Sequence, residues 1–250
     1  MIVSEVMTTK LVTVTADDTL SHAANLLRQY QFHHLPVVRA ASKTVTTKHG
    51  TYTSPLILEG LLTSQDIDLA AALSREHTHG GQSRSWQERR VVEVMKQTGC
   101  LVTPTTSVAA AAQLLVERGI HGMPVVAYAS RETEEQSPEQ ELEAILVGLL
   151  TRSDLLIALA RTMGAYEPGM QLDISLPGGD LTPLTKMLQM VADLHIQLRS
   201  LIAGPMKGSI PLVAHVRLGT MNPTPLLVRL KQAHIAYQFA DLQAEGDAYA

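Results

Sequence analysis

Gly-Leu-Leu-Thr-Ser-Gln-Asp at residues 60–66 recurs 88 positions later (148 − 60 = 88) as Gly-Leu-Leu-Thr-Arg-Ser-Asp at residues 148–154. Glu-Val-Met occurs at residues 5–7 and again at 93–95, with the same offset. His-x-x-Pro-Val-Val occurs at 33–38 and again at 121–126. A single offset shared by three separate motifs indicates two copies of one structural unit.

Each copy has the same pattern of expected elements. A short strand (11–14 and 101–103) precedes a helix whose apolar residues recur at helical spacing (20, 23, 24, 27 and 108, 111, 112, 115). Thr19 and Ser107 are expected N-caps of these helices. Two buried strands follow (35–38 and 57–62; 123–126 and 145–150), and a last helix begins near Thr63 or Thr151. The order β-α-β-β-α predicts an α+β fold in each repeat.

The repeats divide the first two thirds of the chain. We expect the first unit at residues 1–73, a polar linker with two glycines at 74–90, and the second unit at 91–163. Residues 131–143 are rich in glutamate and are expected to form a solvated excursion.

Composition excludes several classes of function. The 250-residue chain is 45% hydrophobic and only 4% aromatic, which disfavours a base-stacking surface for single-stranded nucleic acid. A net charge of −4 without a basic stripe gives DNA binding little support. The sequence shows no secretion signal and no apolar run long enough to span a membrane. One cysteine, Cys100, fits a reducing compartment, so we expect a cytoplasmic protein.

The Thr-x-x-Asp element that closes each repeat has two interpretations. Thr63 with Asp66, and Thr151 with Asp154, fit a helix capping box, in which the carboxylate also lies at the positive end of the helix dipole. The same geometry suits a nucleotide, because free N–H groups at a helix start hold phosphate and a carboxylate accepts ribose hydroxyls. The two interpretations are compatible.

The motifs together resemble a CBS domain pair, also called a Bateman module, over residues 1–163. The resemblance implies that the two repeats pack about a pseudo-two-fold axis and bind an adenosine-containing ligand such as AMP, ADP, ATP or S-adenosylmethionine. It assigns phosphate and ribose contacts to Thr63, Asp66, Thr151 and Asp154. Arg152 is placed to reach a phosphate, whereas its counterpart in the first repeat is Ser64, which carries no charge.

This chain departs from the CBS family pattern at the two residues before the Leu-Pro-Val run. CBS domains often have His-Arg before the Leu-Pro-Val run, whereas this chain has His33-His34 and His121-Gly122. The missing arginines favour a ligand with fewer phosphates or a modest affinity, since His34 is charged only part of the time near neutral pH. The alternative for His33, His34 and His121 is a structural role as partly buried, hydrogen-bonded side chains; metal binding is not expected. The resemblance also suggests that Thr15 and Thr103 line the adenine pocket.

The last third of the chain has a different pattern. The apolar pattern over residues 168–240 predicts the element order β-α-β-β-α-β. This order is ferredoxin-like and resembles that of an ACT domain. ACT domains bind amino acids where the first strand meets the first helix, which here corresponds to Gly178, Gly179 and Asp180. The alternative is a turn that needs the backbone freedom of glycine.

A CBS pair followed by an ACT-like domain resembles the acetoin-utilisation B proteins of bacteria. The leading hypothesis is therefore a regulatory protein that senses an adenine nucleotide, forms a homodimer and requires no cofactor. No catalytic motif is recognised, so an enzyme is not expected. The remaining alternatives are a dimerisation module with vestigial pockets and an amino-acid sensor acting through the ACT-like domain.

Overall fold

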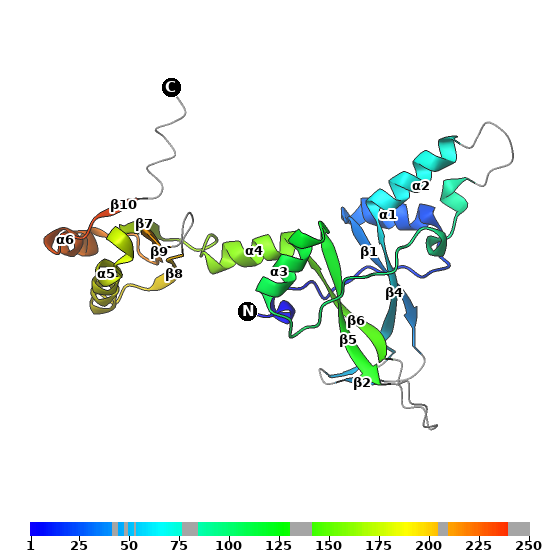
Figure 1. Cartoon of the computed structure of the whole chain (residues 1–250), viewed down its shortest axis with the longest axis horizontal. Helices are drawn as coiled ribbons and strands as arrows, with labels where there is room; N and C mark the ends of the chain where they lie inside the picture. Colours follow the sequence, from blue (N-terminus) through cyan, green and yellow to red (C-terminus); the bar gives the residue numbers. More distant parts are fainter. Residues whose placement is uncertain are drawn as a thin grey trace. The chain divides into compact units, whose positions relative to one another are not determined.

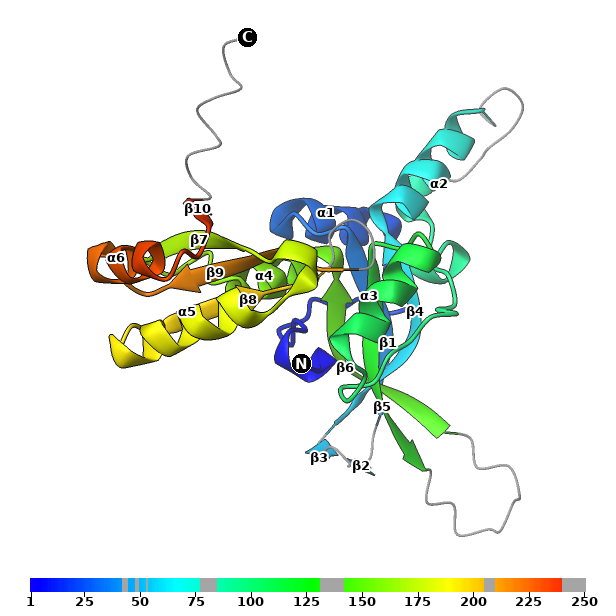
Figure 2. The same ribbon diagram turned by 60° about the vertical axis from the view of Figure 1, so that its left-hand side comes forward.

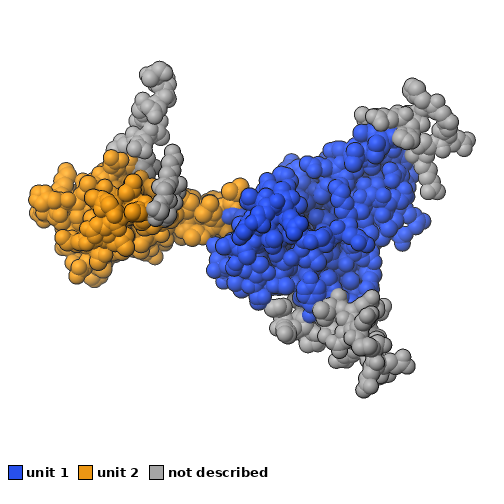
Figure 3. Space-filling view, viewed as in Figure 1, with its two compact units in different colours: residues 1–155 blue, residues 156–250 orange. Residues whose placement is uncertain are grey.

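The computed structural model describes residues 1–41, 45–47, 50–52, 54–76, 85–130, 142–204 and 210–239. The centre of the predicted linker and nearly all of the predicted acidic excursion lie outside these ranges. The chain forms two compact units, residues 1–155 and 156–250 (Figure 3). Each unit has its own antiparallel sheet, so the predicted α+β class is confirmed.

The sheet of the first unit joins the two repeats. Its strand order is β1 (His34–Ala40), β4 (Leu56–Thr63), β6 (Leu142–Thr151) and β5 (Gly122–Ser130), all antiparallel (Figures 1 and 2). The two halves meet where Ile57 lies opposite Ile145, its own counterpart 88 residues later. A residue that pairs with its counterpart marks a pseudo-two-fold relation between the repeats. Strands β2 (Val45–Thr47) and β3 (Gly50–Tyr52) form a separate hairpin.

The helices of the first unit begin where the sequence predicts. Thr19 accepts a hydrogen bond from the His22 N–H at 3.2 Å and caps α1 (Leu20–Tyr30). Ser107 caps α3 (Val108–Glu117) through the Ala110 N–H at 3.1 Å. The closing helices are α2 (Ser64–Glu76) and α4 (Arg152–Thr162), of which α4 begins in the first unit and belongs to the second from Leu156 on. A 3-10 turn, η3 (Trp86–Glu88), precedes the second repeat.

The first strand expected in each repeat is reduced to a single bridge. Val14 pairs in parallel with Val37, and Val102 with Val125. Immediately afterwards the Thr15 N–H donates to the Asp18 carboxylate at 2.7 Å, and this turn directs the chain toward α1. The local hydrogen bond competes with a longer ladder, which explains why a Val-rich segment contributes one bridge instead of a strand.

The segment that opens each repeat packs into the other repeat. Val3, in η1 (Val3–Glu5), is fully buried in the core of the second repeat beside Val102 and Leu115. Val91, in η4 (Val91–Glu93), is fully buried in the core of the first repeat beside Val14 and Leu20. Each core therefore contains residues from both repeats, an exchange that was not evident from the sequence.

Backbone bonds hold the exchanged segments in place. Thr8 exchanges hydrogen bonds with Leu149 in β6 at 2.9 and 3.0 Å, and Lys96 does the same with Leu61 in β4 at 3.0 and 2.9 Å. Both crossings pass over a glycine. A methyl group on Gly60 would lie 2.9 Å from the Lys96 carbonyl oxygen and 3.1 Å from Met95 Sδ.

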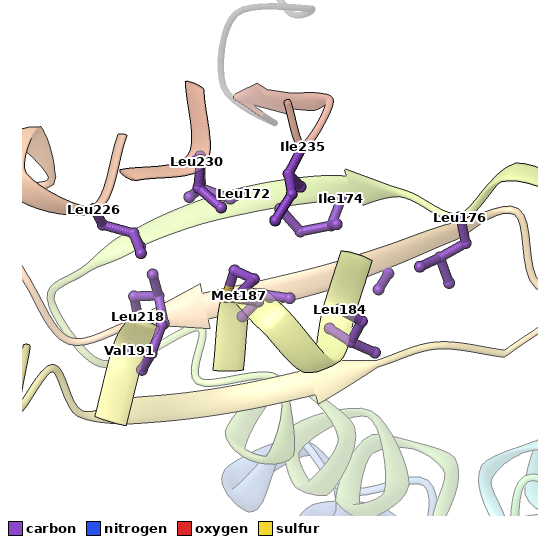
Figure 4. Close-up of a cluster of buried hydrophobic side chains, with 12 residues drawn as sticks. Leu172, Ile174, Leu176, Leu184, Met187, Val191, Leu218, Leu226, Leu230 and Ile235 are labelled. Carbon is purple, nitrogen blue, oxygen red and sulfur yellow. The ribbon is translucent and has the colours of Figure 1, made fainter. Parts of the chain in front are cut away.

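The second unit has the predicted ferredoxin-like order. Its elements are β7 (Met170–Ser175), the turn η5 (Pro177–Gly179), α5 (Thr182–Asp193), β8 (Leu198–Ile202), β9 (Val213–Leu218), α6 (Thr224–Gln232) and β10 (Tyr237–Phe239). The sheet order is β10-β7-β9-β8. Alternate residues of β7 and β9 face the helices and form one core with them, as Figure 4 shows for Leu172, Ile174, Met187 and Leu226.

We predict that Gly60→Ala lowers the free energy of unfolding by about 1–3 kcal/mol, because the added methyl group pushes against a backbone carbonyl that cannot rotate away. Urea denaturation measures the effect. Gly99→Ala is the matched control, since a methyl group there meets no atom within 4 Å. Equal stability of the two variants would contradict close packing at the crossing.

Candidate functional site

A cleft of about 800 Å³ opens in the first unit and is lined by both repeats. It brings together most of the residues proposed from the sequence as a nucleotide site. These are Thr63, Asp66, Thr151, Arg152, Asp154, His33, His34 and His121.

The start of α2 forms a closed hydrogen-bonded turn. Asp66 Oδ2 accepts from the Thr63 N–H at 2.9 Å and from the Thr63 hydroxyl at 2.6 Å. The Asp66 N–H in turn donates to Thr63 Oγ1 at 3.3 Å. These reciprocal bonds are those of a capping box, and they fix the carboxylate at the positive end of the helix.

The start of α4 repeats this geometry. Asp154 Oδ2 accepts from the Thr151 N–H at 2.8 Å and from the Thr151 hydroxyl at 2.7 Å. The Asp154 N–H donates to Thr151 Oγ1 at 3.2 Å. In both repeats one carboxylate oxygen serves the cap, and the other is left for a different partner.

The second carboxylate oxygen, Oδ1, bonds to a residue of the segment that opens the other repeat, and this residue differs between the repeats. Lys96 Nζ lies 2.6 Å from Asp66 Oδ1. Thr8, the counterpart of Lys96, donates its hydroxyl to Asp154 Oδ1 at 3.1 Å. We call Thr63, Ser64, Asp66 and Lys96 half-site A, and Thr151, Arg152, Asp154 and Thr8 half-site B.

Asp66 is the one charged residue among the buried side chains of the described residues, at 4% exposure. Burial raises its pKa, but hydrogen bonds from Lys96 and Thr63 and the charge of Lys96 lower it by more, so the net pKa lies below the ordinary value. Asp66 therefore stays ionised at neutral pH. Its contribution to stability is present above the ordinary aspartate pKa and is lost as the pH falls through the lowered value.

The histidines lie between the two half-sites. His33 Nδ1 is 3.4 Å from the Ser64 hydroxyl. The His34 ring lies over Gly122, its counterpart in the second repeat, where an added methyl group would approach ring atoms to 3.4 Å. Burial lowers the pKa of His34, and repulsion from His33 and His121 lowers it further. His34 is therefore neutral at neutral pH.

Arg152 makes few hydrogen bonds with the protein. Its Nη2 donates to the Leu115 carbonyl at 3.3 Å, and its buried Nε has no hydrogen-bond partner. A buried guanidinium N–H without an acceptor is unfavourable and is suited to an incoming anion.

Thr15 and Thr103 are not part of the cleft lining. The Thr15 hydroxyl donates to Asp18 at 2.9 Å, and the Thr103 N–H donates to Thr106 at 3.1 Å, so both shape turns before a helix. Residues a few positions earlier line the cleft instead. They are Lys10, Leu11 and Val12, and their counterparts Thr98, Gly99 and Cys100. Because the members of each pair are 88 positions apart, the repeat in the sequence could have identified them as counterparts.

The glycines proposed as an ACT ligand site form a turn. Gly178 and Gly179 have φ values of 63° and 82°, a conformation that favours glycine. Asp180 accepts from the N–H and the hydroxyl of Thr182 at 2.9 and 2.7 Å, and these bonds lower its pKa. A cavity of about 590 Å³ in this unit lies elsewhere, beside the paired His215 and Asp173.

Among the described residues, no three His, Cys, Asp or Glu side chains are grouped so as to hold a metal ion. No helix of that part of the chain is long and apolar enough to cross a membrane.

Comparison with known proteins identifies related sequences. The model of the CBS domain matches residues 3–71 and 91–161, which together exceed half of the chain. A CBS domain-containing protein of Dictyostelium discoideum is 25% identical over 169 residues, spanning 67% of this chain and 97% of that protein.

Two solved structures are also similar. A Vibrio cholerae protein named for acetoin utilization (AcuB) is 22% identical with a TM-score of 0.45, and the match covers 67% of this chain and 98% of that one. The CBS domain pair of protein MJ0100, solved in complex with 5′-methylthioadenosine and S-adenosyl-L-methionine, is 19% identical with a TM-score of 0.42. That match covers 64% of this chain and 96% of the pair.

We predict that His34 makes stability depend on pH in the mildly acidic range. Because its pKa is lowered from 6.5, the unfolded chain takes up a proton first as the pH falls, and the folded state loses stability below about pH 6.5. Urea denaturation of the wild type and of His34→Gln, from pH 7.5 to about pH 5, measures this. The variant should show a shallower decline, and identical slopes would contradict the assignment.

Proposed function

The chain belongs to the CBS domain family, whose model matches both of its repeats, and from the chemistry of its cleft we propose that it is a regulatory protein that binds an adenine nucleotide. The observation that carries this proposal is the pair of Thr-Asp caps. Both line one cleft, and in both a single carboxylate oxygen is left outside the capping hydrogen bonds.

The carboxylate oxygen of Asp154 that lies outside the cap suits a ribose hydroxyl. Asp154 Oδ1 accepts one hydrogen bond, from the Thr8 hydroxyl. An ionised carboxylate oxygen has room for a second donor, and hydrogen bonds to a charged acceptor are about twice as strong as neutral ones. Sugar hydroxyls are donors of the right kind.

The phosphate has partners at the same helix start. The Arg152 and Asp154 N–H groups at the start of α4 already donate to the His121 carbonyl and to Thr151 Oγ1. The Arg152 side chain, whose Nε–H has no acceptor, is therefore the main phosphate donor, at the positive end of the helix dipole. His34 is neutral, which limits the positive charge available in the cleft. We therefore propose AMP or ADP over ATP, with S-adenosylmethionine as the alternative adenosyl ligand.

The base has apolar surface nearby. Leu11, Val12 and Ile120 line the same cleft. A largely apolar wall with a few placed polar groups is the usual composition of a small-molecule site.

A second candidate is a dimerisation module with vestigial pockets. The Lys96–Asp66 ion pair favours it for half-site A, because the carboxylate there is already satisfied. The amino-acid sensor has no comparable support, since Asp180 is engaged with Thr182. Four further expectations stay predictions: the homodimer, the cytoplasmic location, the role in acetoin utilisation and the assignment of the last third as an ACT domain.

Isothermal titration calorimetry of the full chain with AMP, ADP, ATP and S-adenosylmethionine tests the proposal. We expect Asp154→Asn to weaken AMP binding by about tenfold or more, which is the loss of one hydrogen bond to a charged acceptor. Asparagine keeps a side-chain oxygen for the cap, so the fold should be retained.

Asp17→Asn is the matched control. Asp17 is an exposed aspartate in the same unit, paired with Arg90 outside the cleft, and its replacement should leave AMP affinity unchanged. Failure of all four ligands to bind the wild type would overturn the proposed function in favour of the dimerisation module.

A further inference from the structure

The two half-sites differ at one position that the repeat makes directly comparable. Lys96 and Thr8 are counterparts, both exposed, and each exchanges backbone hydrogen bonds with the strand that leads into a closing helix. The backbone therefore brings the two side chains to equivalent carboxylates. Any difference in binding between the half-sites at this position comes from the side chain alone.

In half-site A both oxygens of the carboxylate already accept hydrogen bonds, one of them from a charged donor. Asp66 Oδ2 accepts from Thr63, and Oδ1 accepts a charge-assisted hydrogen bond from Lys96 at 2.6 Å. The Asp66 side chain is 3% exposed, whereas that of Lys96 is 74% exposed. The lysine thus covers a buried carboxylate, and a neutral ribose hydroxyl would have to displace an ammonium from it.

In half-site B the same oxygen is more available. The Thr8 hydroxyl reaches Asp154 Oδ1 at 3.1 Å, a longer and neutral-donor hydrogen bond. A hydroxyl rotates at little cost and can accept a hydrogen bond as well as donate one, so a ribose hydroxyl can insert beside it.

The cations are also arranged differently. Arg152, in half-site B, has a buried Nε without an acceptor and one 3.3 Å bond from Nη2 to a carbonyl oxygen. Its counterpart in half-site A is Ser64, whose hydroxyl lies 3.4 Å from His33. Half-site B therefore has an arginine available for phosphate, whereas the ammonium of half-site A is held by Asp66.

We infer that the two half-sites are functionally unequal: half-site B binds the adenosine phosphate, and Lys96 closes half-site A to it. This inference rests on the proposed function and deepens it. One chain then binds one nucleotide, and the identity of residue 96 determines whether a second nucleotide is admitted.

Exchanging the two side chains tests the inference by calorimetric titration with AMP. The wild type should bind one AMP per chain, and Asp154→Asn should weaken that site about tenfold. Lys96→Thr, which gives half-site A the side chain found in half-site B, should admit a second AMP, bound more weakly than the first because Ser64 supplies no charge to the phosphate. Thr8→Lys should abolish the wild-type site by pairing with Asp154.

Lys186→Thr is the control for removing a lysine, because this exposed residue lies in α5 of the other unit. It should bind one AMP, as the wild type does. Far-ultraviolet circular dichroism and thermal unfolding check that each variant is folded, and both exchanged positions are exposed, so the changes should be tolerated. If Thr8→Lys is unfolded, AMP binding by Thr8→Arg and the number of AMP molecules bound by Lys96→Thr test the inference instead.

The outcomes separate the inference from the proposed function. Two equal sites in the wild type, or a single site weakened by Asp66→Asn but not by Asp154→Asn, would overturn the inference and leave nucleotide binding intact. A stoichiometry of one in Lys96→Thr would likewise exclude closure by the lysine. Absence of binding by both the wild type and Lys96→Thr would overturn the proposed function itself.

Discussion

The exchange of opening segments between the repeats is the constraint on which the first unit depends. Val3 is buried in the second core and Val91 in the first, so neither core is complete without residues from the other repeat. Burying a valine contributes about 1.5–3 kcal/mol, and separating the repeats would expose both side chains. The two repeats therefore form one cooperative unit.

The same exchange builds the cleft. After Val3 and Val91 the chain runs on to Thr8 and Lys96, which bond to β6 and β4 and place their side chains on Asp154 and Asp66. The segments that follow, residues 10–12 and 98–100, form part of the cleft wall. Packing of the cores and assembly of the candidate binding site thus have a common cause.

Capping and binding use different atoms of the same aspartates. In each repeat Oδ2 stabilises the helix start, which fixes the orientation of the carboxylate before any ligand arrives. Oδ1 then faces the exchanged segment at a defined position. A preorganised acceptor of this kind loses little conformational entropy when a ligand binds.

Features that depend on local pattern and internal symmetry could be recognised from the amino-acid sequence alone. The offset of 88, the caps Thr19 and Ser107, and the ferredoxin-like order of the last third could all be predicted from it, because helix caps and apolar periodicity act within a few residues of the chain. Most of the candidate site residues could be named for the same reason. The three-dimensional fold was needed to show that Val3 and Val91 are each buried in the core of the other repeat, and that Lys96 and Thr8 reach the aspartates. It also showed that Thr15 and Thr103 lie outside the cleft. These contacts join residues 30 to 146 positions apart, such as Lys96 with Asp66 and Thr8 with Asp154, and no local pattern of hydrophobicity or propensity records them.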